Sequence, residues 1–192
     1  MQVTGVFSEA AIRARDLAFT IIALREDIHT IADNLTTPEA PGNSDSLRRT
    51  QHRDTYPPGS SGHLITAPYS APNSGVPVEG IAQAPGAPPF EFLPQGGRWT
   101  LAAKQRLADL NAPPWAKAVD YHIELQVAAW MIASGHREVV LTINREPCGE
   151  RFGKGCHQVL QAFLPRGYRL RVHGTRGGSS HYTYDYEGRS DR

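Results

Sequence analysis

The sequence predicts an α/β fold with a mostly buried sheet for residues 99–192, on two observations. Segments with apolar residues at helical spacing alternate in this part of the chain with segments rich in β-branched residues. This alternation is typical of proteins in which helices cover a sheet. Hydrophobic residues make up 40% of the 192-residue chain, which is enough for one core of ordinary size and too much for a wholly disordered protein.

Three helices and three strands are expected in this C-terminal part. Leucines and alanines at helical spacing predict the helices, and Gly135 is a candidate C-cap for the second of them. Runs of β-branched and aromatic residues predict the strands. The expected helices are 101–110, 122–134 and 156–164, and the expected strands are 138–144, 168–173 and 181–186.

Residues 1–35 are predicted to form an isolated N-terminal helix, and residues 36–98 a flexible linker. Apolar residues from Leu17 to Leu35 are spaced 4, 3, 4, 3 and 4 apart, which is typical of a helix that packs against another helix. Its partner is either the C-terminal domain, a second copy of the chain or a secretion partner. The linker segment holds 11 of the 15 prolines. Because proline removes backbone donors, no packed core is expected there.

The composition excludes several classes of protein. No apolar run approaches the roughly 18–20 residues that span a bilayer, so neither a membrane protein nor a membrane partner is expected. The N-terminus lacks the charged and apolar regions of a classical signal peptide. Two cysteines cannot build a disulfide-rich scaffold. Residues 99–192 carry 13 Lys and Arg against nine Asp and Glu, so a polyanionic partner would meet this part of the chain.

Basic residues gather near the strand expected at 168–173. Arg169 and Arg171 alternate with apolar residues in this strand, so they share one of its faces. They form either a solvated face or a binding site for the phosphates of a nucleic acid. The cluster is completed by Lys154, Arg166 and Arg176.

Four residues carry the chemistry that the sequence indicates. His122 and Glu124 form a His-x-Glu motif at the start of a helix, while Cys148 follows a strand and Cys156 opens the next helix. Such turns meet at one edge of an α/β sheet, so one histidine and two cysteines could bind one zinc ion and leave its fourth position open. Glu124 would then act as a proton shuttle. Zinc nucleobase deaminases have the related pattern H-x-E then P-C-x-x-C, but seven residues separate the two cysteines here.

Two alternatives for the cysteines stay open. A disulfide between Cys148 and Cys156 would close a short loop that contains three glycines. A closed structural zinc site would need a fourth ligand, for which His157 and His136 are the candidates.

Three further residues are candidates for substrate binding. Trp115 and Tyr121 lie just before His122, where a loop would border a pocket, so either could stack on a base or be buried in the core. Asn144 stands at the end of an expected strand, where a polar side chain caps the turn or holds a nucleotide.

A set of residues in this region matches positions that a known family shares. They are the run from His122 to Met131 (HIELQVAAWM), then Asn144, Pro147-Cys148, Gly155-Cys156, Leu164-Pro165 and Gly167. In these residues the sequence resembles the DddA-like deaminase toxins of bacterial polymorphic toxin systems, over roughly residues 99–175. The resemblance implies a cytidine-deaminase-like three-layer sandwich with a mixed sheet. The β-hairpin that usually opens that fold is not evident before His122, and it is degenerate, hidden in 63–98 or absent.

The resemblance also implies an activity, the hydrolytic conversion of cytosine to uracil in single- or double-stranded DNA. His122, Cys148 and Cys156 would be the zinc ligands, and Glu124 would protonate N3 and pass a proton to the departing ammonia. The protein would be the toxin domain of a secreted effector that acts in the cytoplasm of a target cell, and the producing cell would hold a cognate immunity protein. The alternatives are deamination of RNA or free nucleosides, and a non-catalytic nucleic-acid-binding protein with a structural zinc.

Overall fold

The computed structural model describes residues 48–94, 97–150 and 153–191. The predicted N-terminal helix over 1–35 and the first part of the predicted linker lie outside these residues. None of the helices in the described ranges is long and apolar enough to cross a bilayer.

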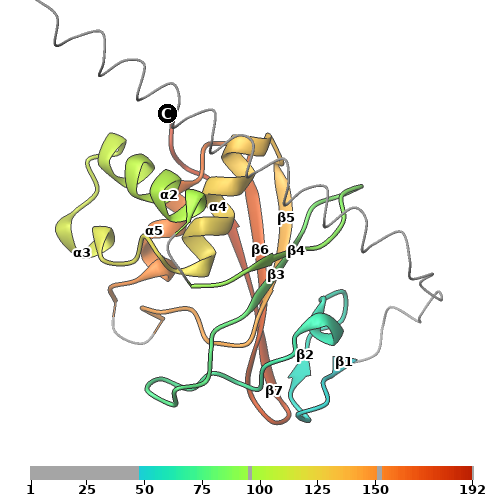
Figure 1. The fold of residues 1–192 in the computed structure, drawn as a ribbon. Helices are drawn as coiled ribbons and strands as arrows, with labels where there is room; N and C mark the ends of the chain where they lie inside the picture. The colour runs from blue at the N-terminus through green and yellow to red at the C-terminus, as the bar shows by residue number, and fades with distance from the viewer. Residues whose placement is uncertain (1–47, 95–96, 151–152, 192) are drawn as a thin grey trace, which may run out of the picture. The chain divides into compact units, whose positions relative to one another are not determined.

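A five-stranded mixed sheet forms the centre of the fold (Figure 1). Its strand order is β4-β3-β5-β6-β7, and the neighbours are antiparallel except for the parallel pair β5 and β6. Both the α/β class and the mixed sheet expected from the sequence are confirmed. The strands are β3 (Gly80–Gln83), β4 (Phe90–Phe92), β5 (Glu138–Ile143), β6 (Arg169–Gly177) and β7 (Ser180–Glu187).

Helices cover one side of this sheet (Figure 1). Nine residues of α4, from Ile123 to Met131, are buried, which is the pattern of a helix that is covered on all sides. It ends at Gly135, whose left-handed φ of 72° suits glycine at a helix C-cap. The helices are α2 (Arg98–Asp109), α3 (Pro114–Lys117), α4 (Ile123–Ser134) and α5 (Cys156–Phe163).

The side chains of β5 and β6 alternate between the two faces of the sheet. Val139, Leu141 and Ile143 of β5 belong to the core beneath the helices, together with Leu170 and Val172 of β6. The residues between them therefore face the opposite side of the sheet.

The opposite side of the sheet is covered in part by residues that precede β3. They form β1 (Arg48–Arg49), β2 (Thr55–Tyr56) and the short 3-10 helix η1 (Gly62–Leu64). Tyr56 and Ile65 make a small apolar cluster with Ile81 of the sheet. The backbone N–H of Ser61 also donates a hydrogen bond to Thr142 of β5 at 2.8 Å.

The part of the expected linker that the structure describes, from residue 48 on, is corrected by this arrangement. It belongs to the same compact unit as the helices and the sheet, and β3 and β4 form the antiparallel hairpin that was not evident in the sequence. Two buried carboxylates bond backbone groups that the irregular chain leaves unpaired. Asp54 accepts from the N–H groups of Tyr69 and Gly178, and Glu79 accepts from those of Thr66 and Ala67. Proline and glycine thus reduce the regular structure of this segment without preventing its packing.

His173 is a buried histidine on the side of β6 that faces away from the helices. It is 6% exposed, and its Nδ1 lies 2.8 Å from the hydroxyl of Thr183 on β7. Burial lowers the pKa of His173 to about 4, and the positive charges of Arg171 and His181 act in the same direction, against Asp185. The folded protein therefore holds this histidine neutral at pH 7.

Acidification is expected to destabilise the wild type more than a His173→Gln variant. The unfolded chain takes up a proton near pH 6.5, whereas folded His173 does so only near pH 4. The free energy of unfolding is therefore unaffected by this group above pH 6.5. It falls by up to about 3 kcal/mol as the pH drops from 6.5 toward 4. Urea unfolding of both proteins across this pH range measures the difference. Parallel stability profiles would show that His173 does not carry this pH dependence.

Candidate metal centre and active site

Three metal-binding side chains meet at one edge of the sheet. His122 is the N-cap residue of α4, Cys156 is the first residue of α5, and Cys148 lies in the loop between β5 and α5. The Nδ1 atom of His122 lies 3.2 Å from Sγ of Cys148 and 3.3 Å from Sγ of Cys156. All three ligand atoms lie within 4.8 Å of one another. The fold thus brings together three residues that are up to 34 positions apart in the chain.

These three side chains fit a metal ion of the zinc type. Imidazole nitrogen and two thiol sulfurs are the donors that zinc prefers. With Zn–S near 2.3 Å and Zn–N near 2.0 Å, tetrahedral geometry separates nitrogen and sulfur by about 3.5 Å. The measured separations are close to that value, so the cluster can close around an ion with a small movement.

The two cysteine thiols lie in different environments. Hydrogen bonding from the Cys156 thiol, together with His122, lowers the pKa of Cys148 to about 4, and the Cys156 backbone N–H donates to Sγ of Cys148 at 3.1 Å. Burial raises the pKa of Cys156. Cys148 is therefore the thiol that this arrangement holds as a thiolate, the form that binds metal.

Neither histidine considered as a fourth ligand belongs to the cluster. Nδ1 of His157 lies 2.9 Å from the hydroxyl of Tyr186, and the ring of His136 lies 4.9 Å from that of Trp130. Among the described residues, the group of possible metal ligands at this place is His122, Cys148 and Cys156 alone. Both cysteines are free thiols here rather than a disulfide. Three protein ligands leave a position for water or substrate, as catalytic zinc sites do.

Glu124 lies beside the ligands in the first turn of α4. Its side chain is only 4% exposed, and burial raises its pKa, with the nearby Cys148 acting in the same direction. It also hydrogen-bonds with Cys156. A buried carboxyl group with a raised pKa can hold a proton near neutral pH and release it to a neighbouring group.

Gly155 allows the two cysteine-bearing segments to approach each other. A Cβ atom at this position would collide with the backbone carbonyl of Cys148. The Gly-Cys pair at the start of α5 is therefore a steric requirement of the cluster as well as a helix start.

Tyr121 lies beside His122, whereas Trp115 packs against the core. The Tyr121 ring is 49% exposed, and its centroid lies 4.6 Å from that of His122. Trp115 belongs to α3 and packs partly buried against the core. The structure therefore favours Tyr121 as the aromatic residue that a base could meet and the core position for Trp115.

Asn144 is fully buried, and its side chain is bonded to the protein itself. Its Oδ1 accepts from the N–H of Glu79 at 2.8 Å, and its Nδ2 donates to the carbonyls of Pro68 and Pro77 at 2.9 and 3.0 Å. These contacts join the end of β5 to the irregular segment before β3. Of the two roles considered for Asn144, this geometry favours the turn cap over the nucleotide contact.

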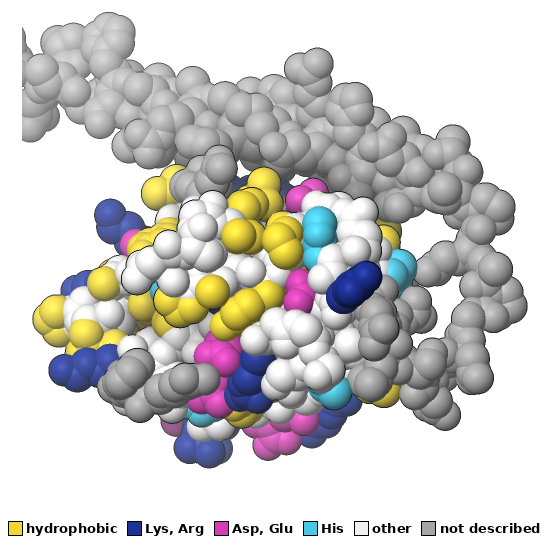
Figure 2. Space-filling view, turned by 90° about the horizontal axis from the view of Figure 1, so that it is seen from below, with side chains coloured by type: hydrophobic (Ala, Val, Ile, Leu, Met, Phe, Trp, Pro, Cys, Tyr) yellow, Lys and Arg dark blue, Asp and Glu magenta, His cyan; other side chains and the backbone are white. Residues whose placement is uncertain are grey.

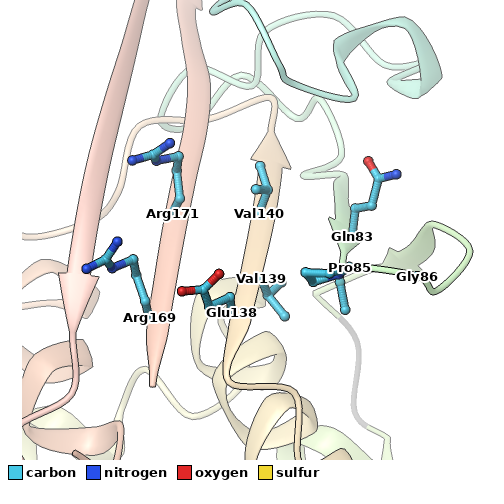
Figure 3. A pocket seen from close by; sticks show the side chains of 9 residues that line it. Gln83, Pro85, Gly86, Glu138, Val139, Val140, Arg169 and Arg171 are labelled. Carbon is cyan, nitrogen blue, oxygen red and sulfur yellow. The ribbon is translucent and has the colours of Figure 1, made fainter. Parts of the chain in front are cut away.

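Arg169 and Arg171 are not brought to the metal centre. They lie on the sheet face opposite the helices, where they line a pocket of about 340 Å³ with Glu138 and Val140 (Figure 3). The reason is the alternation along β6, in which the neighbouring Leu170 belongs to the core on the helix side.

Both arginines are also paired with acidic side chains of β7. Arg169 bonds Glu187 at 3.0 Å, and Arg171 bonds Asp185 at 2.7 Å. On the face seen in Figure 2, Lys and Arg side chains likewise lie beside Asp and Glu rather than forming a continuous basic patch. The phosphate-binding role of this pair stays a prediction, in which a phosphate would share the two guanidinium groups with these carboxylates.

Two residues near the site, Arg145 and Gln126, were not predicted from the sequence. Arg145 follows β5, and its charge acts on the pKa of His122, against the raising effect of Cys148 and Glu124. Gln126 is buried on α4, and its Nε2 donates to the carbonyl of Tyr121 at 2.9 Å. The only feature of the sequence that pointed to Gln126 is its place one helical turn after His122.

The comparisons with known proteins agree with this arrangement. The family model of the SCP1.201-like deaminases matches residues 57–190, which include the hairpin of β3 and β4, the three residues of the cluster and Glu124. The comparison with curated proteins gives no match. A histidine, two cysteines and a buried glutamate at the edge of an α/β sheet, together with this match, show that the chain belongs to the SCP1.201-like deaminase family.

Proposed function

We propose that this protein hydrolyses cytosine to uracil and ammonia in DNA, with a zinc ion held by His122, Cys148 and Cys156. The observation that carries the proposal is the buried carboxyl group of Glu124 beside three convergent ligands. Membership of a deaminase family supports the reaction class. The resemblance to DddA-like toxins supports cytosine in DNA as the substrate.

A zinc ion held by His122, Cys148 and Cys156 would supply the polarisation that makes a water molecule nucleophilic near neutral pH. Glu124 takes a proton from that water and gives it to N3 of the ring, which makes C4 more electrophilic. The water oxygen bonds to C4, and Glu124 then passes the second proton of that oxygen to the amino group, so that the C4–N bond breaks, ammonia departs and a carbonyl remains at C4. The burial of Glu124 suits this role, because burial raises its pKa and keeps the carboxyl group out of bulk water. Both conditions help a carboxyl group to take up a proton and pass it on.

Tyr121 is the residue that we propose to meet the base. Its ring is half exposed beside His122, and Gln126 holds its backbone carbonyl in place. A target base that leaves its stack needs a surface on which to stack again, and an exposed aromatic ring supplies one.

The biological role that follows is that of a toxin. We propose that the domain is delivered as a secreted effector to the cytoplasm of a target cell, and that the producing cell protects itself with an immunity protein. The predicted N-terminal helix would bind a secretion partner or a second copy of the chain. These proposals rest on the resemblance noted in the sequence.

The test is uracil formation in cytosine-containing oligonucleotides, single-stranded and duplex, with the zinc-loaded wild type and a Glu124→Ala variant. Uracil from the wild type alone is expected, in at least one DNA form. Matched RNA oligonucleotides and free cytidine are assayed in parallel. Activity on RNA or cytidine but not on DNA would overturn the substrate and keep the reaction. No product from any of them would favour the non-catalytic alternative with a structural zinc.

A further inference from the structure

We propose that Arg176 is a positioning residue that holds Cys148 in the geometry for metal binding. The inference rests on the metal site of the proposed function and adds a residue from the β6–β7 hairpin that no part of the sequence motif contains. It rests on two ion pairs, which Arg176 forms with Glu146 before Cys148 and with Glu150 after it.

Cys148 is the ligand with the least regular support. His122 and Cys156 stand at the starts of α4 and α5, where the helices fix their backbones. Cys148 lies instead in the loop between β5 and α5, outside any helix or strand. Its own contacts reach the starts of the two helices: the N–H groups of Cys156 and His157 on α5, and Nδ1 of His122 before α4. A second set of contacts is needed to fix the other side of this loop.

Arg176 supplies those contacts from the end of β6. Its Nε lies 3.1 Å from Glu146, and its Nη2 lies 2.6 Å from Glu150. The two glutamates stand two residues before and two residues after Cys148. All three charged side chains are less than 30% exposed, so these pairs are shielded from solvent more than surface pairs are.

Two tyrosines of β7 extend the same contact. The hydroxyl of Tyr182 donates to the carbonyl of Arg145, and that of Tyr184 donates to Glu150. The guanidinium of Arg176 lies 5.2 Å from the centre of the Tyr182 ring. Gly174 makes room for Tyr182, because a Cβ there would collide with its hydroxyl. The hairpin thus holds the loop on both sides of Cys148.

The charge of Arg176 is what makes this arrangement stable. Without it, the two partly buried carboxylates of Glu146 and Glu150 would have no cation between them. Like charges in such a place repel, and a buried charge that loses its partner destabilises the structure around it. The loop would relax away from the hairpin and carry Cys148 out of reach of the other two ligands. Outer residues of this kind typically change metal affinity 10–100-fold.

The test compares zinc affinity in Arg176→Met and Arg171→Met by competition with a chelator. Arg171 is the matched control, because it lies on the same strand and bonds Asp185 at 2.7 Å on the opposite face. We expect about 10–100-fold weaker zinc binding for Arg176→Met and a change of less than about twofold for Arg171→Met. Arg176→Lys keeps the charge but loses the two-armed geometry, so an intermediate affinity is expected. Urea unfolding of each protein with and without zinc separates the structural cost of each change from its effect on zinc binding.

Equal zinc affinity in the two methionine variants would overturn the inference. If Arg176→Met does not fold, Glu146→Gln takes its place, since it removes one of the two ion pairs and leaves Arg176 bound to Glu150. A loss of affinity on the order of tenfold is then expected, and an unchanged affinity would overturn the inference equally. A wild type that binds no zinc would remove the metal site and the inference together, whereas zinc binding that ignores Arg176 removes the inference alone.

Discussion

Replacing Glu124 with Gln is expected to lower the rate of deamination by about 10²–10⁴-fold while the zinc content stays at the wild-type level. The amide has the shape of the carboxyl group but cannot carry a proton from water to the base, and proton transfer contributes this much to typical enzymes. Glu124 is buried beside the ligands and is not one of the three residues of the metal cluster. The rate with a cytosine substrate and the bound zinc per protein chain are the two measurements.

Glu91→Gln is the matched control, because Glu91 is an exposed glutamate on β4. Its activity should equal that of the wild type. Full activity in Glu124→Gln would show that another group moves the protons, and the mechanism proposed here would fail. Loss of zinc together with activity would instead assign Glu124 a role in holding the metal centre.

Replacing Asn144 with Ala is expected to lower the free energy of unfolding by about 3–5 kcal/mol. The side chain is fully buried and makes three hydrogen bonds, so its removal leaves one N–H and two carbonyl groups of the backbone without partners. Each such group costs about 1–3 kcal/mol, and local relaxation recovers part of the sum. Urea unfolding measures the change.

Gln105→Ala serves as the control for Asn144→Ala. Gln105 is an exposed amide on α2 that bonds Asp109 at 2.8 Å, and its loss should cost less than about 0.5 kcal/mol. A stable Asn144→Ala protein that has lost activity would restore the other role considered for this residue, a contact to the nucleotide.

The helices and the central strands could be predicted because their signals are local. The spacing of apolar residues placed α4 and α5, and the β-branched run placed β5. The hairpin of β3 and β4 could not be predicted, since it lies among prolines and glycines. The irregular segment before it is fixed by the side chains of Asp54 and Glu79, which bond backbone groups 12 to 124 positions away in the chain.

The candidate site residues also fall into those whose position the sequence could predict and those whose position it could not. His122, Cys148 and Cys156 could be assembled from the sequence because each stands at a turn, and turns at one edge of a sheet converge. The alternation along β6 could be predicted as well. Which of its faces lies on the side of the helices depends on how the helices pack. The sequence therefore did not show that Arg169 and Arg171 line the opposite face, or that Arg176 pairs with two glutamates beside Cys148.

The sequence by itself therefore determined the class of chemistry and the α/β architecture, because donor types, helix starts and hydrophobic spacing are properties of short segments. Only the tertiary structure decided that Asn144 is bonded within the protein and that Tyr121 stands exposed beside His122. It also decided that the loop of Cys148 is held by charges from another strand. Such contacts join residues far apart in the chain, and their energies depend on burial and distance, which no local pattern records.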